Sequence, residues 1–454
     1  MELDVIVIGA GQAGVPLAAR LAGEGRRVLL AERSRPGGTC VNVGCTPTKT
    51  LLASARAAHV ARTSARLGVE AGPVRVDFQA VIARKDEMVR RWRDGVERRL
   101  AGAGESLKVV PGHARFTGPR EVEVNGERHR AAVVVVNAGA RPAVPPLPGL
   151  EAVPWLDNRR VMELRELPAH LVVLGGGYVG CEFAQMFRRF GAEVTVVDHN
   201  PHLLAREDED VSAEVERFFR EEGIGLRLGA SVERVEPVAG GVRLALAGRE
   251  VRGSQLLVAT GRRPNSDDLG CEAAGVERDA RGFVRVDDHF HTSAEGVYAV
   301  GDVTGGPQFT HVAWDDHRLL HAVLAGRPGR GRSGRVVPHV VYTDPQVAGV
   351  GLTEREARAR GVPYELATMP YAQVARAAET GETAGLMKLL VDPATEAILG
   401  ATLVGAEAGE IVHVLAALKH VGAPARAVVE MIHAHPAFSE GLQSLAMRLP
   451  RYAG

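Results

Sequence analysis

Short apolar runs and glycine-rich turns alternate along the first part of the chain. Residues Asp4–Ile8 are rich in valine and isoleucine, the stretch VPLAARLAGEG after the first glycines is expected to be a helix, and RRVLLAE ends at Glu32. A short apolar run before a glycine turn predicts a buried strand. The order strand, helix, strand therefore predicts a βαβ unit.

The same order of elements returns in HLVVLGGGYVGCEFAQMFRRFGAEVTVVD. Here we predict a strand over Leu171–Leu174, a helix running through Phe190, and a strand ending at Asp198. The run AAVVVV at 131–136 is predicted to be a buried strand. The first part of the chain is therefore expected to be α/β, with two βαβ units.

Each βαβ unit carries a GxGxxG pattern between its first strand and its helix. The glycines are Gly9, Gly11 and Gly14 in the first unit and Gly175, Gly177 and Gly180 in the second. Such glycines allow a tight turn and close approach of a pyrophosphate, which binds at the helix N-terminus. An acid follows eighteen residues after the third glycine in both units, Glu32 and Asp198, where it can accept hydrogen bonds from ribose hydroxyls. We favour two bound dinucleotides over a duplicated unit with one inactive copy.

Further glycine turns follow other predicted strands. The stretch 133–149 leads to Gly139 and a proline-rich crossover, and 256–265 passes through Gly261 in a similar way. In GVYAVGDVTGG a strand leads to Gly301 and Asp302. Asp302 either belongs to a tight turn or is directed at a ribityl or ribose hydroxyl.

The last part of the chain has a different pattern. The basic, glycine-rich stretch 326–335 is predicted to be a solvated linker, not an anion site. After it, HVVYTDPQVAGVGL and GLMKLLVDPATEAILGATLVG alternate as antiparallel strands do, and helices follow. This α+β composition is typical of an interface domain.

Composition excludes several classes of protein. The chain has 454 residues, 45% of them hydrophobic, with 55 Lys and Arg balanced by 55 Asp and Glu. The charge balance gives no reason to expect nucleic acid or an anionic membrane as the main partner. No apolar stretch reaches the roughly 18 residues of a membrane span, and Glu2 and Asp4 stand where a secretory signal has basic residues. We therefore expect a cytoplasmic protein.

The stretch GGTCVNVGCTPTK, residues 37–49, holds two of the four cysteines, Cys40 and Cys45. On an ideal helix a five-residue step separates two Cα atoms by ~7.5 Å along the axis, whereas a disulfide requires Cα atoms within about 6.8 Å. A bridge therefore requires the backbone to leave ideal helix geometry, which Asn42 and Gly44 tolerate. A strained, accessible bridge is easily reduced.

Three uses of this cysteine pair are open: metal binding, inert thiols, or redox chemistry. Structural zinc requires four ligands, and Cys181 and Cys271 are single cysteines in other elements. Structural disulfides are rare in the cytoplasm. Redox chemistry is the favoured interpretation, and no metal site is predicted.

Six motifs occur in one order along almost the whole chain: GAGQAG, GGTCVNVGCTPTK, GGGYVGCE, ATGRRPN, AVGDV and HAHPAFSE. In this respect the chain resembles class I flavin-dependent pyridine nucleotide–disulfide oxidoreductases, the family that includes dihydrolipoamide dehydrogenase, glutathione reductase and mercuric reductase. The resemblance implies two Rossmann-like nucleotide-binding domains and a C-terminal α+β dimerisation domain. Its implied boundaries are 1–145 and 266–335 for the two parts of the FAD domain, 146–265 for the NAD(P) domain and 336–454 for dimerisation.

The resemblance also implies roles for individual residues. Cys45 would face FAD as the charge-transfer thiolate and Cys40 would be the thiol that meets substrate. Lys49 would lie by the flavin and pair with Glu182, and His435 with Glu440 would be the acid–base acting on Cys40 of the other subunit of a homodimer. Tyr178 resembles the gate that covers the flavin until the nicotinamide arrives. The implied cofactor-binding residues are Gly9, Gly11, Gly14, Glu32, Gly38, Thr39, Gly139, Gly175, Gly177, Tyr178, Gly180, Asp198, Gly261, Gly301 and Asp302.

Individual residues indicate which branch of the family the chain resembles and which nicotinamide nucleotide it is expected to prefer. Tyr178, CTPTKTLLASA and GDVTGGPQFTHVAWDD resemble the mercuric-reductase-like and reactive-chlorine-resistance branch, although the chain ends in MRLPRYAG, where mercuric reductase has a cysteine pair. Thr46 stands where the family usually has an aliphatic residue, and Ala437 stands where it usually has a threonine. Asp198 would repel the 2′-phosphate of NADPH, so we expect a preference for NADH, softened by His199, His202 and Arg206.

The predicted function is transfer of electrons from NAD(P)H through FAD and Cys40–Cys45 to a small disulfide, oxidant or metal ion. Dihydrolipoamide dehydrogenase is the alternative enzyme. A flavin-bearing metal-binding or scaffold protein with idle thiols is the alternative from another class.

Overall fold

The computed structural model describes residues 3–327 and 329–452. The chain divides into two compact units, each assembled from three segments. The first unit holds Met1–Thr50, Ile82–Ala143 and Gly261–Arg335, and the second holds Leu51–Val81, Val144–Thr260 and Val336–Gly454. Helices α3 (Cys45–Thr63) and α4 (Phe78–Ala101) carry residues of both units.

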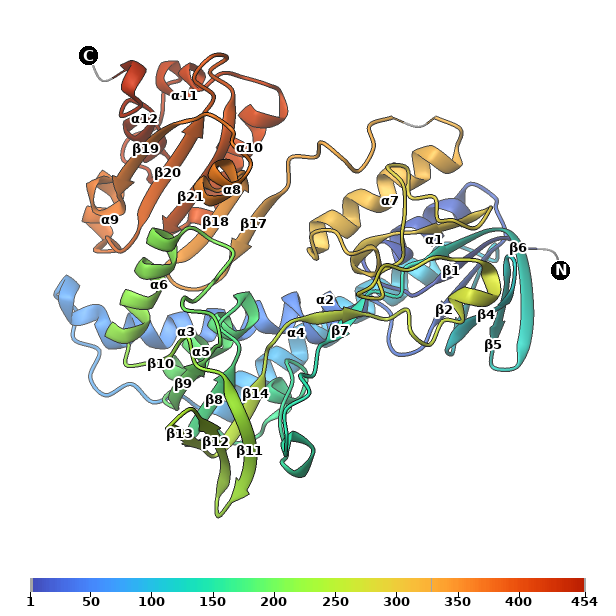
Figure 1. Cartoon of the computed structure of the whole chain (residues 1–454), viewed down its shortest axis with the longest axis horizontal. Coiled ribbons are helices and arrows are strands. Elements are labelled where there is room, and N and C mark those ends of the chain that lie inside the picture. Colours follow the sequence, from blue (N-terminus) through green and yellow to red (C-terminus); the bar gives the residue numbers. More distant parts are fainter. Residues whose placement is uncertain (1–2, 328, 453–454) are drawn as a thin grey trace. The chain divides into compact units, whose positions relative to one another are not determined.

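A mixed sheet with strand order β3-β2-β1-β6-β5-β4 forms the centre of the first unit, and β16 also pairs with β6 (Figure 1). Strand β1 is parallel to both β2 and β6, whereas β5 is antiparallel to β6. The strands are β1 (Leu3–Ile8), β2 (Val28–Glu32), β3 (Leu107–Pro111), β4 (Ala114–Gly118), β5 (Glu121–Val124), β6 (Glu127–Val136) and β16 (Val297–Ala299).

Alternation along the strands gives this sheet two buried faces. Val5 and Val7 of β1 pack into a cluster with residues of α1 (Gly14–Gly23) and α7 (Thr310–Leu324). Ile6 and Ile8 point to the other face and pack into a second cluster that includes Phe116. A strand buried on both faces shows a continuous apolar run, as in β1 and in AAVVVV of β6.

Smaller elements complete the first unit. Strands β7 and β15 pair antiparallel, and the short helix α2 precedes α3. The bounds are α2 (Gly38–Val43), β7 (Ala140–Pro142), β15 (Arg262–Pro264), and 3₁₀ turns η4 (Cys271–Ala274) and η5 (Gly301–Thr304).

The second unit contains a parallel sheet with strand order β10-β9-β8-β14 and a separate antiparallel sheet β11-β12-β13. Helix α5 follows β8, so that β8, α5 and β9 form the second βαβ unit. The bounds are β8 (His170–Leu174), α5 (Tyr178–Phe190), β9 (Glu193–Val197), α6 (Glu209–Glu221), β10 (Gly225–Arg227), β11 (Val232–Val238), β12 (Gly241–Leu246), β13 (Arg249–Gly253), β14 (Gln255–Val258), and turns η1 (Ser64–Leu67), η2 (Leu150–Ala152) and η3 (Arg160–Glu163).

An antiparallel sheet with order β17-β18-β21-β20-β19 forms the C-terminal part of the same unit (Figure 1). Its core packs against α10 and α12, with Leu389, Leu403, Leu415 and Leu445 buried. The bounds are β17 (Pro338–Val341), β18 (Gln346–Gly351), α8 (Glu354–Ala359), β19 (Glu365–Pro370), α9 (Ala375–Thr380), β20 (Leu386–Val391), β21 (Ile398–Gly405), α10 (Ala408–His420), α11 (Arg426–Glu430), α12 (Gly441–Ala446), and turns η6 (Tyr371–Gln373), η7 (Phe438–Glu440) and η8 (Pro450–Tyr452).

The predicted fold class, two βαβ nucleotide-binding folds followed by an α+β part, is confirmed. The end of one strand differs from the prediction. Strand β9 ends at Val197, so Asp198 is the first residue after the strand and not its last. The four predicted domain ranges stay a prediction. No helix within residues 3–327 and 329–452 is long and apolar enough to cross a membrane.

The prediction of a solvated linker at 326–335 is wrong at its C-terminal end. The side chain of Arg335 is 6% exposed and its guanidinium donates a hydrogen bond of 2.7 Å to Asp316, and Arg332 donates to Thr304. Because the carboxylate of Asp316 is itself buried in α7, it requires such a partner. Pro328 lies outside the described residues.

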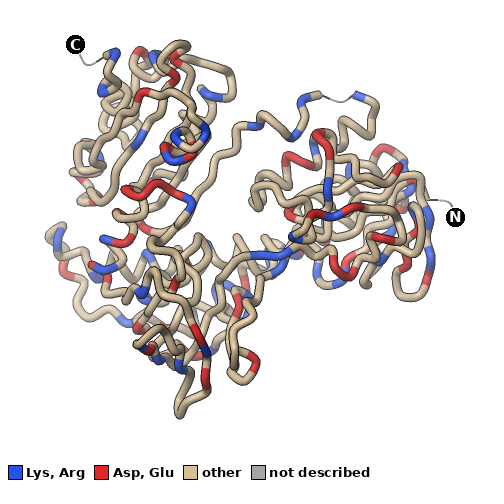
Figure 2. The backbone as a smooth tube through the Cα atoms, viewed as in Figure 1, with Lys and Arg blue, Asp and Glu red and all other residues tan. Residues whose placement is uncertain are grey.

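Acidic and basic residues are interspersed along the backbone of both units (Figure 2).

Candidate functional site

The first glycine turn brings β1 against the start of α1 at distances that exclude a side chain. Gly9 has φ of +104°, and a Cβ there would lie 2.3 Å from the carbonyl oxygen of Asn137. A Cβ on Gly14 would lie 2.1 Å from the oxygen of Gly9, and one on Gly38 would lie 2.8 Å from the Cα of Gly11. The amide of Asn137 donates to the same Gly9 oxygen at 2.9 Å. These contacts explain why glycine is required at these positions. They also identify Asn137 as a residue of the turn that lies outside the GxGxxG motif.

Glu32 ends β2 with its carboxylate fixed beside this turn. One oxygen accepts from the Ala10 N–H at 2.7 Å and the other accepts from the Ser34 N–H at 2.7 Å. The carboxylate is thus anchored to the turn that would receive a pyrophosphate. Its hydrogen bond to a ribose stays a prediction.

Gly301 and Asp302 begin η5, close to Arg262 of β15. The Gly301 N–H donates to Asp316 at 2.8 Å, and a guanidinium nitrogen of Arg262 lies 3.7 Å from the Asp302 carboxylate. Burial raises the pKa of Asp302, which Arg262 opposes. Among the described residues, the buried Nε of Arg262 has no partner. An orphaned donor beside a glycine turn fits a site for an anionic cofactor such as FAD.

Gly139 and Gly261 stand where two chain crossings meet in the first unit. The Gly139 carbonyl accepts from the Asn265 N–H at 3.0 Å, and the Gly261 carbonyl accepts from the Ala143 N–H at 2.9 Å. Both glycines have positive φ, 69° and 124°. Their positions are therefore explained by the backbone, and contact with a cofactor stays a prediction.

The second glycine turn repeats the geometry of the first. Gly175 has φ of +113° with a would-be Cβ 2.5 Å from the oxygen of Ala259, and a Cβ on Gly180 would lie 1.9 Å from the oxygen of Gly175. Around Gly177, by contrast, a would-be Cβ meets no atom of the described residues within 4 Å apart from Gly177 and its two chain neighbours. Open space at the second glycine of the motif is where a pyrophosphate approaches the backbone.

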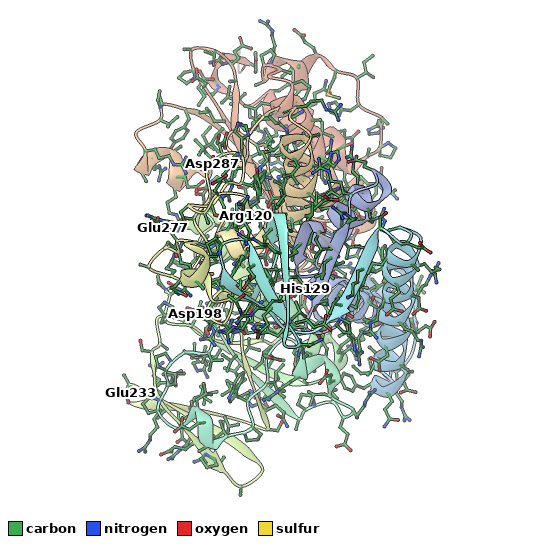
Figure 3. The ribbon with its side chains drawn as sticks, turned by 90° about the vertical axis from the view of Figure 1, so that its right-hand side faces the viewer. Arg120, His129, Asp198, Glu233, Glu277 and Asp287 are labelled. Atoms are coloured by element: carbon green, nitrogen blue, oxygen red, sulfur yellow. The ribbon has the colours of Figure 1, made fainter. Side chains whose placement is uncertain are left out.

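Asp198 (labelled in Figure 3) is only 7% exposed and already accepts several hydrogen bonds. One oxygen accepts from the Gly176 N–H at 2.5 Å. The other accepts from the Asn200 N–H at 2.7 Å and from its side-chain amide at 2.9 Å, and lies 3.3 Å from His199. The carboxylate therefore ties the β9 loop to the glycine turn, a role that sequence reasoning did not identify.

The cysteine pair is brought together by a break between α2 and α3. Gly44 stands between the helices with φ of −133° and ψ of −116°, which confirms that the backbone leaves helix geometry between the cysteines. Cys40 is half-buried and Cys45 is exposed, and Cys40 shares a hydrogen bond with Cys45. Thr39, next to Cys40, is exposed.

The surroundings of Cys40 disfavour its ionised form. The pKa of Cys40 lies well above its usual range because the thiol hydrogen-bonds to Cys45, is partly shielded from water and faces Cys45. Thr310 and Lys49 act in the opposite direction. The assignment of the thiolate to Cys45 stays a prediction.

Thr310 is a site residue that the sequence analysis missed. Its hydroxyl lies 3.2 Å from the Cys45 Sγ, and it is the first residue of α7. A helix N-terminus stabilises a nearby thiolate through its partial positive charge. A threonine opening the helical pattern in PQFTHVAWDD was the available signal.

Lys49 and Glu182 lie in different compact units. Glu182 is buried in α5 and accepts a hydrogen bond of 2.9 Å from the Tyr342 N–H. Lys49 lies in α3, one turn after Cys45. The ion pair between Lys49 and Glu182 stays a prediction.

His435 and Glu440 form the predicted pair. The Nδ1 of His435 lies 2.9 Å from a carboxylate oxygen of Glu440, and the histidine side chain is 72% exposed. A carboxylate on one ring nitrogen leaves the other nitrogen available to exchange a proton. This arrangement fits a general acid–base that acts on a group outside its own segment.

Tyr178 opens α5 directly after Gly177 and donates a hydrogen bond of 2.6 Å to Glu207. Glu207 and its second partner His339 are also residues that the sequence analysis did not single out. Within the described residues, no group of His, Cys, Asp and Glu has the arrangement of a metal site.

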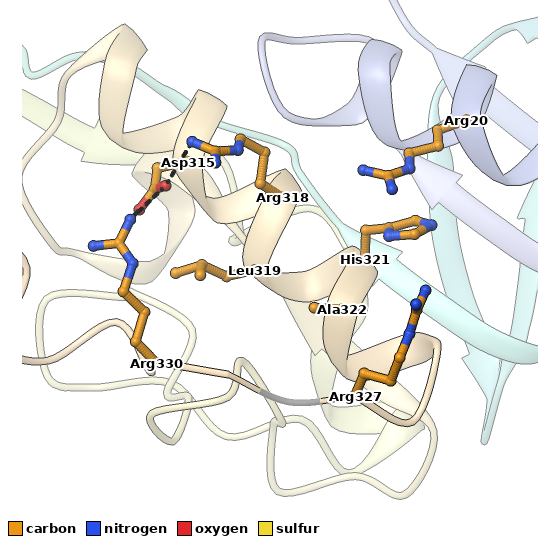
Figure 4. Close-up of a pocket in the computed structure, with 8 residues that line it drawn as sticks. All are labelled: Arg20, Asp315, Arg318, Leu319, His321, Ala322, Arg327 and Arg330. Carbon is orange, nitrogen blue, oxygen red and sulfur yellow. Dashed lines mark hydrogen bonds and ion pairs between the residues drawn. The ribbon is translucent and has the colours of Figure 1, made fainter.

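A cavity of about 390 Å³ lies beside α7 in the first unit (Figure 4). Arg20, Arg318, Arg327 and Arg330 line it, and Asp315 pairs with Arg318 and Arg330. None of the predicted site residues lines this cavity.

Comparison with protein-family models gives two matches that together span most of the chain. The model described as pyridine nucleotide-disulphide oxidoreductase matches residues 3–316. The model described as pyridine nucleotide-disulphide oxidoreductase, dimerisation domain, matches residues 337–446.

Several curated relatives match over nearly the full chain. Dihydrolipoyl dehydrogenase of Thermus scotoductus is 37% identical, covering 99% of this chain and 98% of its own length. Probable pyridine nucleotide-disulfide oxidoreductase RclA of Escherichia coli is 35% identical over 98% of both chains. Mercuric reductase of Lysinibacillus sphaericus is 35% identical over 98% of this chain and 82% of its own.

A solved structure shows the same fold. The HOCl-induced flavoprotein disulfide reductase RclA from Escherichia coli superimposes with a TM-score of 0.90 at 35% identity, covering 98% of this chain and 99% of that one.

Proposed function

Since the chain belongs to the pyridine nucleotide-disulphide oxidoreductase family, we propose that it passes electrons from NAD(P)H through FAD and Cys40–Cys45 to a small disulfide, oxidant or metal ion. The observation that carries this proposal is the thiol pair itself. Cys40 and Cys45 share a hydrogen bond beside Lys49 and the first residue of α7. Positive charge and a helix N-terminus together favour a thiolate at Cys45.

The chain's own residues have separate tasks in this proposal. FAD, when bound, would supply two-electron transfer between the nicotinamide and the disulfide. The first glycine turn, Glu32 and Arg262 would hold FAD, and the second glycine turn would hold NAD(P)H. Cys45 carries the thiolate next to the flavin, and Cys40 exchanges with the substrate. His435, oriented by Glu440, moves the proton that this exchange requires.

The identity of the electron acceptor is tested with a panel of acceptors given to the purified FAD-loaded enzyme. Lipoamide, glutathione disulfide, mercuric ion, hypothiocyanite and quinones would each be compared by kcat/KM with NADH and NADPH. Rapid turnover of dihydrolipoamide with NAD would favour the alternative, dihydrolipoamide dehydrogenase. If no acceptor is reduced faster than molecular oxygen, the proposed function is wrong.

A homodimer is expected because His435 must reach Cys40 of another subunit. The part of the chain after Val336 exposes large apolar side chains, among them Ile432 at 97% and Val421 at 74%. Light scattering should give roughly twice the chain mass of 48.3 kDa. Ile432→Glu should shift the particle towards the monomer mass. A fully active monomer would contradict the expectation.

We expect kcat/KM for NADH to exceed that for NADPH by about tenfold. Two like charges within about 4–6 Å near a surface cost on the order of 1–4 kcal/mol before screening, and Asp198 would face the 2′-phosphate. In Asp198→Ala the preference should shrink. Glu193→Ala, at an exposed carboxylate that begins β9, serves as control and should leave the ratio unchanged. An Asp198→Ala variant with the wild-type ratio would remove Asp198 from cofactor selection.

A further inference from the structure

The cavity beside α7 lies at the far ends of two helices that begin at the first glycine turn and at the cysteines. Helix α1 starts at Gly14 and α7 starts at Thr310, whereas Arg20 and His321, which line the cavity, lie in the last turns of these helices. At about 1.5 Å per residue, His321 lies roughly 16 Å along α7 from Thr310. The cavity is therefore separate from the site proposed for electron transfer.

Positive charge dominates the lining of this cavity. Its volume of about 390 Å³ lies within the range of small-molecule pockets, about 300–1,000 Å³. Four arginines but one carboxylate, that of Asp315, belong to the lining. The remaining lining residues are Leu319, His321 and Ala322. The lining thus carries an excess of positive charge even when the histidine is neutral, which favours an anion as ligand.

Asp315 is shared among more guanidinium groups than it can neutralise. Its oxygens accept hydrogen bonds of 2.9 and 3.1 Å from Arg330. A nitrogen of Arg318 lies 3.6 Å from the same carboxylate, and a nitrogen of Arg335 lies 3.4 Å from it. Because each guanidinium has five N–H donors, Arg318 and Arg330 keep donors for a further acceptor.

A second group of basic side chains surrounds His321. Figure 4 shows the guanidinium groups of Arg20 and Arg327 on either side of the His321 ring. Glu24 partly compensates this group, since its carboxylate lies 2.7 Å from the Nε2 of His321 and 3.5 Å from Arg20. Among the described residues, the side chain of Arg327 has no hydrogen bond or ion pair. An anion would supply the partner that Arg327 lacks.

The two groups of arginines are separated by the apolar side chains of Leu319 and Ala322 (Figure 4). Guanidinium groups bind phosphate oxygens in a bidentate geometry, which carboxylates and phosphates match better than other anions do. One phosphate could contact only one of the two groups. An anion with several linked phosphates could contact both.

We propose that this cavity binds a small anion with two or three linked phosphates, either an inorganic polyphosphate or the phosphate chain of a nucleotide. The site lies outside the electron path of the proposed function. The sequence-based expectation that the stretch 326–335 is not an anion site is thereby revised for Arg327 and Arg330. Their positions in the sequence do not show that they lie beside arginines of α1 and α7.

The test is calorimetric titration of the FAD-loaded enzyme with tripolyphosphate, without divalent cations and at about 0.15 M salt, where exposed charges are largely screened. We expect one anion per chain, and at least about tenfold weaker binding of orthophosphate. A second titration with ATP, in the presence of saturating NAD⁺, distinguishes the two sources. If ATP binds as tightly as tripolyphosphate, the site accepts a nucleotide, and if ATP is excluded, the ligand is inorganic.

Arg20→Gln and Arg318→Gln each remove one guanidinium, from different groups. Both side chains are more than half exposed, at 51% and 63%, so the fold should be retained. Each change should raise the dissociation constant for tripolyphosphate by about tenfold, the equivalent of one hydrogen bond between charged groups. Arg281→Gln and Arg285→Gln are matched controls, because both arginines are exposed in the same unit, 3.7 Å from a carboxylate. They should leave the dissociation constant unchanged.

Three results would overturn the proposal: no binding of tripolyphosphate at this salt concentration, more than one anion per chain, or equal weakening in Arg285→Gln and Arg318→Gln. Orthophosphate that binds as tightly as tripolyphosphate would also overturn the choice of linked phosphates. No NAD(P)H is oxidised in the tripolyphosphate titration, so its outcome does not depend on whether the proposed function is correct.

Discussion

Replacement of Cys45 by alanine should abolish disulfide turnover while the enzyme still binds FAD. We expect kcat with a disulfide acceptor to fall by at least about 10³-fold, because the interchange thiol can then no longer form its intramolecular bridge. FAD should be retained, since the glycine turn after β1 and the Glu32 carboxylate are held by hydrogen bonds that do not involve Cys45. The measurement is a steady-state assay alongside the flavin absorption spectrum.

Cys40→Ala separates the tasks of the two thiols. Its loss should also end disulfide exchange, but the long-wavelength thiolate-to-flavin band should remain because Cys45 is intact. Cys271→Ala is the control, since Cys271 is a thiol buried in the hydrophobic cluster that contains Ile6 and Ile8. If Cys40→Ala loses the band and Cys45→Ala keeps it, the assignment of the two thiols is reversed.

Replacement of His435 by glutamine should lower turnover with a disulfide acceptor by about 10²–10⁴-fold, the usual contribution of a general acid–base. Reduction of the flavin by NAD(P)H should proceed at the wild-type rate, because that step requires no proton from His435. Stopped-flow spectroscopy measures the two steps separately.

His433→Gln is the matched control, because His433 is a neighbouring histidine whose Nε2 lies 3.4 Å from the backbone carbonyl of Val428. It should keep most of the activity. If His435→Gln and His433→Gln are equally active, the His435–Glu440 pair is not the acid–base.

The repeating patterns made the fold predictable. Each βαβ unit has a strand buried on both faces, which gives a continuous apolar run, and a glycine turn whose spacing follows from backbone contact. A Cβ at Gly14 or Gly180 would lie about 2 Å from a carbonyl oxygen, at 2.1 and 1.9 Å. Such positions accept only glycine, so the glycine spacing in the sequence follows directly from these backbone contacts.

The residues that sequence analysis missed act through single side chains far apart in the chain. Thr310 reaches Cys45 from 265 positions away, and His339 reaches Glu207 from 132 positions away. Neither lies in a spacing that a motif records. Arg335 was misjudged for the related reason that a glycine-rich, basic stretch gives no sign of the buried Asp316 that its guanidinium pairs with.

The role assigned to Asp198 illustrates a different limit. Its position after β9 was predicted correctly within one residue, but its hydrogen bonds were not. The carboxylate accepts from Gly176 and Asn200, so it also braces the glycine turn. An acid at this position in the sequence therefore does not reveal how much of its bonding capacity is left for a ribose.

The central claim is that electrons reach the acceptor through Cys40 and Cys45. Anaerobic titration of the FAD-loaded wild type with NADH or NADPH tests it most directly. The account predicts a long-wavelength thiolate-to-flavin charge-transfer band, together with two newly titratable thiols per chain that are absent in Cys45→Ala. A flavin that bleaches directly with no such band and no new thiols would contradict the account and favour a flavin-bearing scaffold with idle cysteines.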